Sequence, residues 1–389
     1  MRPVTVLYHL LGLMPIADAS RIGPRRYTPG TTREGFLRAD PVRTDKIEIT
    51  PKNLLVGTSS SPKGQVLKHR STESPSLSGI RAYVSGLDDD GKVFFLCDNV
   101  NMGDGDSILQ PSVTDLQDAN ADVNWGFVEL TYMKDSLYAN ISYVDFVGIV
   151  LGMMLTERDG STQTTAGLVV DAVTKICDDL KKQGTNEGRD WKSLCVANLD
   201  GKPVRVLSPG NRHELDSQLF ANYWDAYVNQ VWEEYTEKDL IINTQSSTGR
   251  VKCRVSGDEL VCEGSNRGFA KPNAKDIWGC NSGPFAIVEA DNAIHSAVVP
   301  RLCAAFVRST LLLQGGDAQP ALDQNSYYTV SPTNHYSRIV HSYEVDGRGY
   351  AFPYDDVNPD GNEDASGVVS SNAVQSLTIY VGGPPSHAR

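Results

Sequence analysis

Short runs of β-branched and aromatic residues occur at both ends of this 389-residue chain, whereas its middle shows helical spacing. From about residue 46 to 152 the apolar runs are separated by turns rich in Asp and Gly, and the same pattern returns after Gly316, which is typical of β-strands. Strands at both ends favour one β-domain with an inserted segment. We therefore expect a mainly β fold, with a barrel or sandwich of residues 20–164 and 316–389 and a mixed α/β domain of residues 165–315.

Helical spacing between these β-rich parts predicts three helices. Apolar residues line one face between positions 169 and 180, and a second apolar face runs from 219 to 235. A third helix is expected over 293–313, kinked or divided by Pro300. The second face is aromatic and includes Trp224 and Trp232, which we interpret as core residues because aromatic side chains at helical spacing usually face inward. Lining of sugar subsites is the alternative.

The net charge argues against a nucleic-acid-binding protein, and the N-terminal pattern predicts a secreted one. A net charge of −12 disfavours a nucleic-acid partner, which would require a basic surface, whereas a neutral polysaccharide tolerates an acidic protein. An apolar run follows Arg2 and precedes Ala17-Asp18-Ala19, the pattern of a signal peptide cleaved after Ala19. The run is shorter than the about 20 residues that span a bilayer. We therefore expect residues 1–19 to be removed and the mature protein to be secreted, without a membrane partner.

All seven cysteines follow this segment and should mostly pair in an oxidising compartment. Cys253 and Cys262 flank a short turn, and two strands joined in this way bring their β-carbons close enough for a disulfide. The next expected pairs are Cys280 with Cys303 and Cys177 with Cys195, which leaves Cys97 as a buried thiol in an apolar run.

The run from Trp125 to Gly148 contains two carboxylates among residues that favour strands, Glu129 and Asp145. A charged group inside such a run costs free energy unless it is exposed in a cleft or has a partner. Two carboxylates facing one another are what glycoside hydrolysis requires, one as an acid and the other as a nucleophile or base. Two ordinary edge-strand charges are the alternative from spacing alone.

The turn between the two runs decides whether the carboxylates share a face. A two-residue turn at 134–135 would put Asp145 on the face opposite Glu129, because side chains alternate along a strand. We therefore expect a longer loop over 134–138, which pairs Glu129 with Tyr143 and makes Asp145 a diagonal neighbour. Diagonal β-carbons lie about 7–8 Å apart, within the roughly 6.5–9.5 Å that leaves room for a water molecule in an inverting enzyme.

The same segment resembles a known family. F-V-E-L-T-Y and L-Y-A-N-I-S-Y-V-D-F-V-G are similar to the catalytic segment of glycoside hydrolase family 64. The resemblance implies a secreted endo-β-1,3-glucanase with a thaumatin-like β-fold and a wide groove between its two parts. It also implies an inverting mechanism with Glu129 as general acid and Asp145 as general base. Further matches, within a span from about Lys46 to Val381, are G-C-N-S-G-P-F-A at 279–286, R-L-C-A-A-F-V-R-S-T-L-L at 301–312, P-T-N-H-Y-S-R-I-V-H at 332–341 and Y-A-F-P-Y-D-D-V at 350–357.

Four further polar residues are candidates for binding substrate hydroxyls. Thr131 shares a face with Glu129 at the strand period of two. The resemblance adds Asp122, before the same strand, and the acidic pair Asp355 and Asp356. A solvated or outward-facing position is the alternative for these residues.

No cofactor or metal is expected. Residues 356–361 imitate the start of an EF-hand loop, but position twelve is Gly367 rather than Glu, so turn chemistry explains them better. His341, in a family-like segment, is interpreted as a hydrogen-bonded structural histidine. We predict a monomer whose partner is β-1,3-glucan. The alternative from another class is a glucan-binding or defence-type thaumatin-like protein that has lost turnover.

Overall fold

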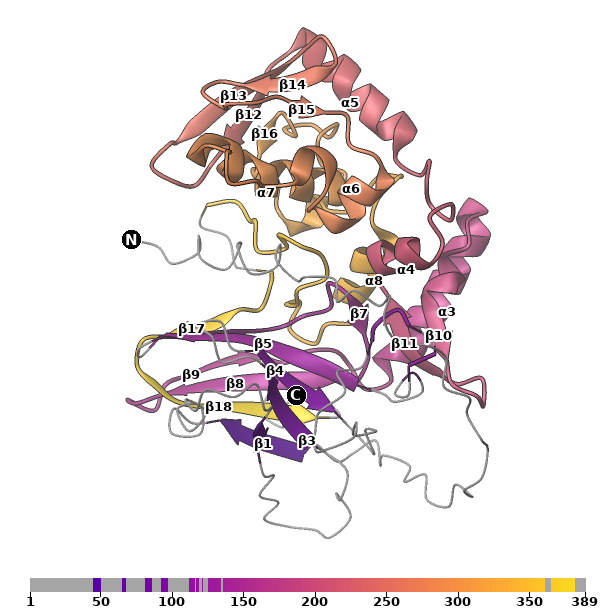
Figure 1. Cartoon of the computed structure of the whole chain (residues 1–389), viewed down its shortest axis with the longest axis vertical. Coiled ribbons are helices and arrows are strands. Elements are labelled where there is room, and N and C mark those ends of the chain that lie inside the picture. Colours follow the sequence, from indigo (N-terminus) through magenta and orange to yellow (C-terminus); the bar gives the residue numbers. More distant parts are fainter. Residues whose placement is uncertain are drawn as a thin grey trace.

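The structure is a computed structural model of the chain. Figure 1 shows two large sheets at the bottom, a helical part with a smaller sheet at the top, and the short strand β7 with α4 and α8 between them. The part of the chain that the structure describes therefore combines helices and several sheets, in place of the expected mainly β fold. The described residues are 45–49, 65–67, 81–85, 92–96, 112–115, 117–118, 121, 125–133, 136–360 and 365–381.

The lower part is built from two antiparallel sheets that share one apolar core. The six-stranded sheet has the order β17-β6-β5-β4-β3-β2, and the four-stranded sheet has the order β1-β18-β8-β9. Val128, Leu155 and Ile379 belong to a single buried cluster, and β6 and β17 of the first sheet contact β8 of the second, so the two sheets pack against each other. Their strands are β1 (Asp45–Ile49), β2 (Gln65–Leu67), β3 (Arg81–Ser85), β4 (Lys92–Leu96), β5 (Trp125–Met133), β6 (Ser136–Ile141), β8 (Leu151–Glu157), β9 (Thr162–Thr165), β17 (Val369–Ser371) and β18 (Val374–Val381).

The expected barrel is wrong for the part of the chain that is described. Closure needs the first and last strands of a sheet to pair. In the six-stranded sheet, however, β17 pairs with β6 at one edge while β2 ends the other edge, and the four-stranded sheet is likewise open. Of the two predicted forms, the structure agrees with a sandwich of open sheets.

The upper part contains a five-stranded sheet of order β15-β14-β13-β12-β16, with α5, α6 and α7 beside it (Figure 1). Trp224 is fully buried and Trp232 is 4% exposed, which confirms the interpretation of the aromatic stripe as core. β16 pairs with β12 and lies beyond residue 315, so this sheet extends past the expected domain boundary. The elements are α5 (Asp225–Glu237), β12 (Leu240–Asn243), β13 (Arg250–Ser256), β14 (Glu259–Cys262), β15 (Phe269–Ala270), α6 (Ala274–Gly279), η4 (Gly283–Phe285), α7 (Ala293–Val307), β16 (Ala318–Gln319) and η5 (Gln324–Ser326).

The three predicted helices are present, with different ends. The first begins at Ala172 and buries Val173, Ile176 and Leu180. The third contains Pro300 but ends at Val307 rather than 313, and Ser309 beyond it has φ 54°, a left-handed conformation that cannot continue the helix. The remaining elements are β7 (Phe146–Val147), α3 (Ala172–Glu187), η3 (Trp191–Leu194), β10 (Cys195–Ala197), β11 (Pro203–Leu207), α4 (Pro209–Leu215) and α8 (His335–Ser342).

Three disulfides join distant or opposed parts of the chain. Cys253 and Cys262 face each other in paired strands, as the spacing predicts. All three expected pairs are confirmed, namely Cys253–Cys262, Cys280–Cys303 and Cys177–Cys195. Cys97 and the expected signal peptide, residues 1–19, lie outside the described residues.

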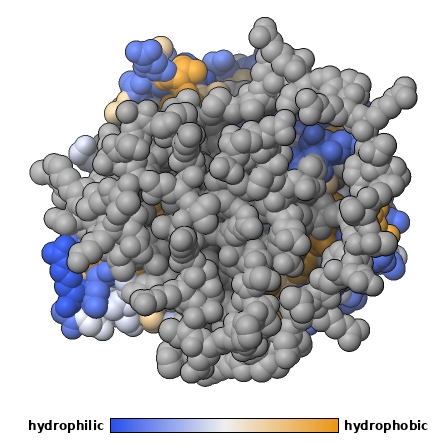
Figure 2. Space-filling model, turned by 60° about the horizontal axis from the view of Figure 1, so that its bottom comes forward, coloured by the Kyte–Doolittle hydropathy of each residue, from blue (hydrophilic) through white to orange (hydrophobic). Residues whose placement is uncertain are grey.

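Apolar side chains on the described surface are scattered. Leu199, at the β10–β11 turn, is the most exposed large one at 79%. In Figure 2 small hydrophobic areas are visible at the top and at the lower right, with hydrophilic residues near them. None of the helices in the described part of the chain has the length and apolar character needed to cross a membrane.

Candidate active site

The β5–β6 hairpin has a tight turn, so the longer loop expected from the sequence is wrong. Met133 pairs with Ser136, and Glu129 pairs with Asn140 rather than with Tyr143. The core explains this register, because it places Ile141 beside Val128 and Ala139 beside Leu130, all of them buried. A shift by three residues would reverse the two faces of β6 and turn its apolar residues away from the core.

Glu129 lies on the face of β5 that turns away from this core. The alternate residues Trp125 and Phe127 share that face, and they form a second buried cluster with Phe146 and Leu207. Glu129 continues the row and its side chain is partly exposed. The carboxylate therefore lies at the border between an apolar cluster and solvent, opposite the buried Asn140.

Asp145 is positioned by a bend and not by strand pairing. β6 ends at Ile141, and the chain bends through Asp145 before β7 begins at Phe146. The side-chain amide of Asn211 donates to Oδ1 of Asp145 at 3.1 Å, and the backbone N–H of Ser208 donates to its main-chain oxygen at 2.8 Å. Ser208 is the N-cap of α4, whose first turn carries Asn211, so this helix start orients the carboxylate.

Buried tyrosines fix the position of the segment that precedes Asp145. The backbone N–H of Tyr143 donates to the oxygen of Tyr350 at 2.7 Å, and Ser142 forms a β-bridge with the same residue. The hydroxyl of Tyr336, on α8, donates to the main-chain oxygen of Tyr143 at 2.6 Å. The position of Asp145 is therefore determined by three other segments, namely the start of α4, helix α8 and the segment at Tyr350.

The segments that carry the two carboxylates meet in one aromatic cluster. The rings of Phe127 and Phe146 lie 5.9 Å apart between centroids, and those of Trp125 and Phe146 lie 4.4 Å apart. Glu129 follows Phe127 on the same face of β5, and Asp145 immediately precedes Phe146. Because β6 ends at Ile141, the alternation of faces along that strand does not extend to Asp145.

Asp355 is deeply buried and already satisfied. Its side chain is 1% exposed and accepts from Arg308 at 3.0 Å, lies 3.1 Å from Nε2 of His341 and accepts from the backbone N–H of Ala351 at 2.8 Å. Burial alone would raise the pKa of Asp355, but the two cations outweigh it and lower the pKa below its ordinary value. This geometry indicates a structural role rather than direct contact with a sugar.

The other predicted substrate residues fare differently. Asp356 is partly exposed and accepts from the hydroxyl of Tyr350 at 2.8 Å, which links it to the segment that supports Asp145. Thr131 occupies the position two residues after Glu129 on β5, opposite Tyr138. Asp122 lies outside the described residues.

His341 is the structural histidine that the sequence predicts. It lies between two buried carboxylates, with Nδ1 3.0 Å from Glu344 and Nε2 3.1 Å from Asp355. Burial by itself would lower the pKa of His341, but these carboxylates outweigh it and raise the pKa to about 10. Because this exceeds the ordinary value of about 6.5, the stabilisation by His341 is complete below about pH 6.5 and is lost as the pH rises through about 10.

Replacing His341 by Asn is expected to lower the free energy of unfolding by about 3–5 kcal/mol, since it removes the cation shared by two buried carboxylates and leaves Arg308 as the partner of Asp355 alone. Urea denaturation at pH 7 measures this loss. Adding Glu344→Gln should restore part of it, because one of the uncompensated charges is then removed. A loss below about 1 kcal/mol, the value for exposed pairs, would contradict the role given to this histidine.

Within the described residues no group of three or more His, Cys, Asp or Glu side chains could hold a metal ion. The candidate site comprises two carboxylates, the aromatic cluster near them and the amide of Asn211, which donates to Asp145.

Comparison with known proteins places the chain in a family. The model of the β-1,3-glucanases of glycoside hydrolase family 64 matches residues 43–381. The chain belongs to this family. Similar relatives are the glucan endo-1,3-β-glucosidases of Cellulosimicrobium cellulans and of Arthrobacter sp. strain YCWD3, each 27% identical over 272 residues. The match covers 67% of this chain and 47% of each relative, so the chain spans about half the length of these proteins.

Solved structures of family 64 share the fold. A laminaripentaose-producing β-1,3-glucanase, in complex with laminaritetraose, is similar with a TM-score of 0.62 and 27% identity over 77% of both chains. A family 64 domain from Clostridium beijerinckii is similar in fold, with a TM-score of 0.57 and 20% identity over 75% of both chains.

The sequence analysis missed the residues that position the candidate site. Asn211 carries no local signal beyond the S-P-G-N start of a helix, although Ser208 there is a recognisable N-cap. Tyr336 and Tyr350 lie in segments that the resemblance had singled out, but only the fold shows what they contact.

Proposed function

We propose that the protein is an endo-acting β-1,3-glucanase that cleaves by inversion, with Glu129 as general acid and Asp145 as general base. The observation that carries the proposal is that the segments of the two carboxylates, β5 and the bend before β7, meet in one aromatic cluster, in a chain of family 64. The similarity to a β-1,3-glucanase in complex with laminaritetraose supports a β-1,3-glucan as substrate.

The chemistry assigns each carboxylate one proton transfer. Glu129 protonates the glycosidic oxygen as the bond to the leaving sugar breaks, while Asp145 removes a proton from a water molecule that attacks the anomeric carbon from the opposite face. The β-linked substrate therefore releases an α-configured reducing end. Over the cycle the acid loses a proton and the base gains one, and exchange with solvent restores both.

The surroundings of the two groups support these roles. Asn211 donates a hydrogen bond to Asp145, and a donor favours the charged carboxylate that a base needs. Opposite Glu129, the buried Oδ1 of Asn140 has no hydrogen-bond partner and can accept from a protonated carboxyl group.

The rest of the proposal concerns substrate and location. We assign sugar contacts to Asp356, Thr131 and Asp122, and an indirect role to Asp355, which holds the segment that carries Asp356. A wide groove in a thaumatin-like fold would admit a long glucan and release short oligosaccharides. The three disulfides and the N-terminal pattern support secretion, and we propose that the secreted protein is a monomer.

Proton NMR during hydrolysis of linear β-1,3-glucan tests the function and the stereochemistry together. The expected first product carries an α-configured reducing end, followed by mutarotation to the mixture. A β-configured first product would replace the general base by a nucleophile and overturn the role of Asp145. Tight binding of glucan without any release of reducing ends would favour the non-catalytic glucan-binding protein instead.

A further inference from the structure

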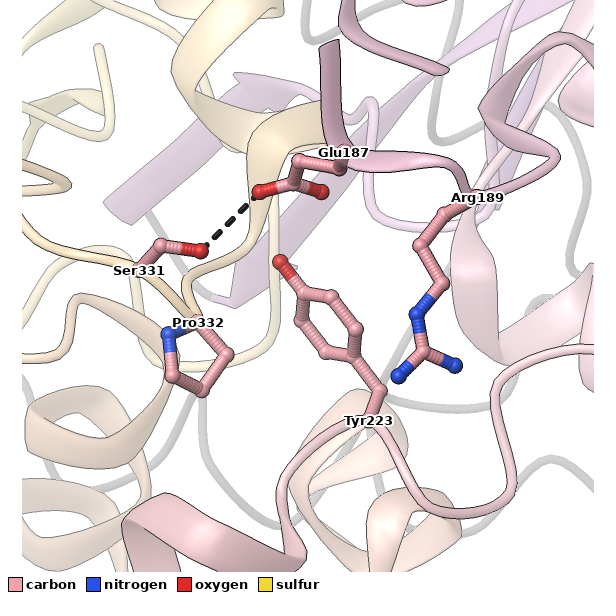
Figure 3. A pocket seen from close by; sticks show the side chains of 5 residues that line it. All are labelled: Glu187, Arg189, Tyr223, Ser331 and Pro332. Carbon is pink, nitrogen blue, oxygen red and sulfur yellow. Dashed lines mark hydrogen bonds between the residues drawn. The ribbon is translucent and has the colours of Figure 1, made fainter. Parts of the chain in front are cut away.

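A small pocket opens where the end of α3 meets the loop before α8. It has a volume of about 270 Å³ and is lined by Glu187, Arg189, Tyr223, Ser331 and Pro332. Figure 3 shows the Glu187 carboxylate and the Arg189 guanidinium on different sides of the Tyr223 ring. These residues belong to none of the contacts that position Glu129 or Asp145.

The two charged side chains of the pocket, Glu187 and Arg189, do not form an ion pair with each other. Among the described ion pairs Glu187 is paired with His335, at 2.7 Å, and none joins Glu187 to Arg189. Arg189 donates through Nη1 to Asn222 at 3.0 Å, and its guanidinium lies 5.7 Å from the centre of the Tyr223 ring. A guanidinium has five N–H donors, so Arg189 keeps donors for a ligand in this pocket.

His335 does not cancel the charge of Glu187. The Nε of Arg338 donates to Nδ1 of His335 at 3.0 Å, which makes that nitrogen an acceptor and leaves the proton on Nε2, facing Glu187. Burial, the largest cause, lowers the pKa of His335, in accord with a neutral ring. The pocket therefore presents one anion and one cation.

We propose that this pocket binds one glucose unit of a β-1,3-glucan chain, apart from the site of cleavage. A neutral sugar matches separated charges of opposite sign, because its hydroxyls donate to Glu187 and accept from Arg189, whereas a charged ligand would be repelled by one of them. The volume of about 270 Å³ is below the roughly 300–1,000 Å³ of pockets for drug-sized ligands. One sugar ring fits such a space better than several.

The wall of the pocket is held in place before any ligand arrives. The Tyr223 hydroxyl donates to the oxygen of Thr333 at 3.0 Å, and the Glu187 carboxylate accepts from Ser331 at 2.9 Å and from the indole N–H of Trp191 at 2.8 Å. A preorganised site loses less entropy when it binds. The identity of the sugar rests on the proposed function, while the pocket itself does not.

Two indole N–H groups can report on the two sites separately. Trp191 donates to Glu187 in the pocket, and Trp125 belongs to the aromatic cluster beside Glu129. The experiment titrates ¹⁵N-labelled Glu129→Gln protein, which should not hydrolyse the ligand, with laminaritetraose and follows both indole resonances. We expect both to move. Arg189→Gln should weaken the response of Trp191 about tenfold, the loss of one hydrogen bond from a charged group, and leave the Trp125 response in place.

Lys181→Gln is the matched control, because it removes one positive charge from an exposed site on the same helix as Glu187. Unchanged resonances of the other indoles establish that each variant is folded. If the Trp125 resonance moved and the Trp191 resonance did not, the pocket proposal alone would be overturned. The same conclusion would follow if Arg189→Gln left the response of Trp191 unaltered. A Trp191 shift in a wild-type protein that releases no sugar would overturn the proposed function but not the pocket. If neither indole resonance moved, both the pocket proposal and the proposed function would be overturned.

Discussion

Replacing Glu129 by Gln is expected to lower kcat on β-1,3-glucan by about 10²–10⁴-fold, the usual contribution of a general acid. The amide has nearly the same shape and stays at the border of the cluster formed by Trp125, Phe127, Phe146 and Leu207, but it cannot supply a proton to the leaving oxygen. KM should change little, because the loss falls on the transition state. Reducing-end release from linear glucan measures both constants.

The leaving group provides a sharper test of this acid. An oligosaccharide with an activated aryl leaving group needs little protonation, so the same variant should recover most of its rate on that substrate. Glu263→Gln, which alters an exposed carboxylate after β14, is the control and should behave as the wild type. Equal losses of Glu129→Gln on both substrates would show that Glu129 is not the proton donor.

Replacing Asp145 by Asn should cause a loss of similar size, about 10²–10⁴-fold in kcat, because the attacking water then lacks its base. A small anion such as azide, which needs no deprotonation, should restore part of the rate. In an inverting enzyme the product of that rescue is the α-configured glycosyl azide. Proton NMR identifies the anomer, and a β-configured azide would contradict the assignment of Asp145.

A companion variant separates the base from its support. Asn211→Ala removes the amide that donates to Asp145 at 3.1 Å but keeps the carboxylate. Loss of one such hydrogen bond is worth about 1.5–3 kcal/mol when a charged group is involved, so kcat should fall about 10–100-fold. Azide should not rescue it. A rate for Asn211→Ala as low as that of Asp145→Asn would mean that the amide itself takes part in the chemistry.

The hairpin shows where local pattern was informative and where it was not. The two strands, their polar turn and the two carboxylates can all be read from the run between Trp125 and Gly148. The register could not be derived from them, because the expectation assumed one continuous strand from the turn to Asp145. The tertiary structure ends that strand at Ile141 and bends the chain, so the face of Asp145 is set by Tyr350, Tyr336 and Ser208 instead.

Asp355 and Asp356 likewise differ in their tertiary contacts and not in their local sequence. Adjacent in sequence, they are equivalent as candidates for a sugar contact. In the fold Asp355 is enclosed by Arg308 and His341, while Asp356 remains partly exposed beside Tyr350. A buried carboxylate needs partners supplied by other elements, and nothing next to it in the chain reveals which of the two will receive them.

By itself the amino-acid sequence determined what depends on neighbours along the chain: the strands at both ends, the helices in the middle, the three disulfides and the family membership that its motifs predict. Only the tertiary structure decided the open sheets in place of a barrel, the tight hairpin, the support of Asp145 by Asn211 and two tyrosines, and the pocket between Glu187 and Arg189. The physical reason is that periodicity and turn chemistry act over a few residues, whereas burial, charge pairing and side-chain orientation depend on contacts between segments that are far apart in the sequence, such as Asp145 with Asn211 and with the segment at Tyr336.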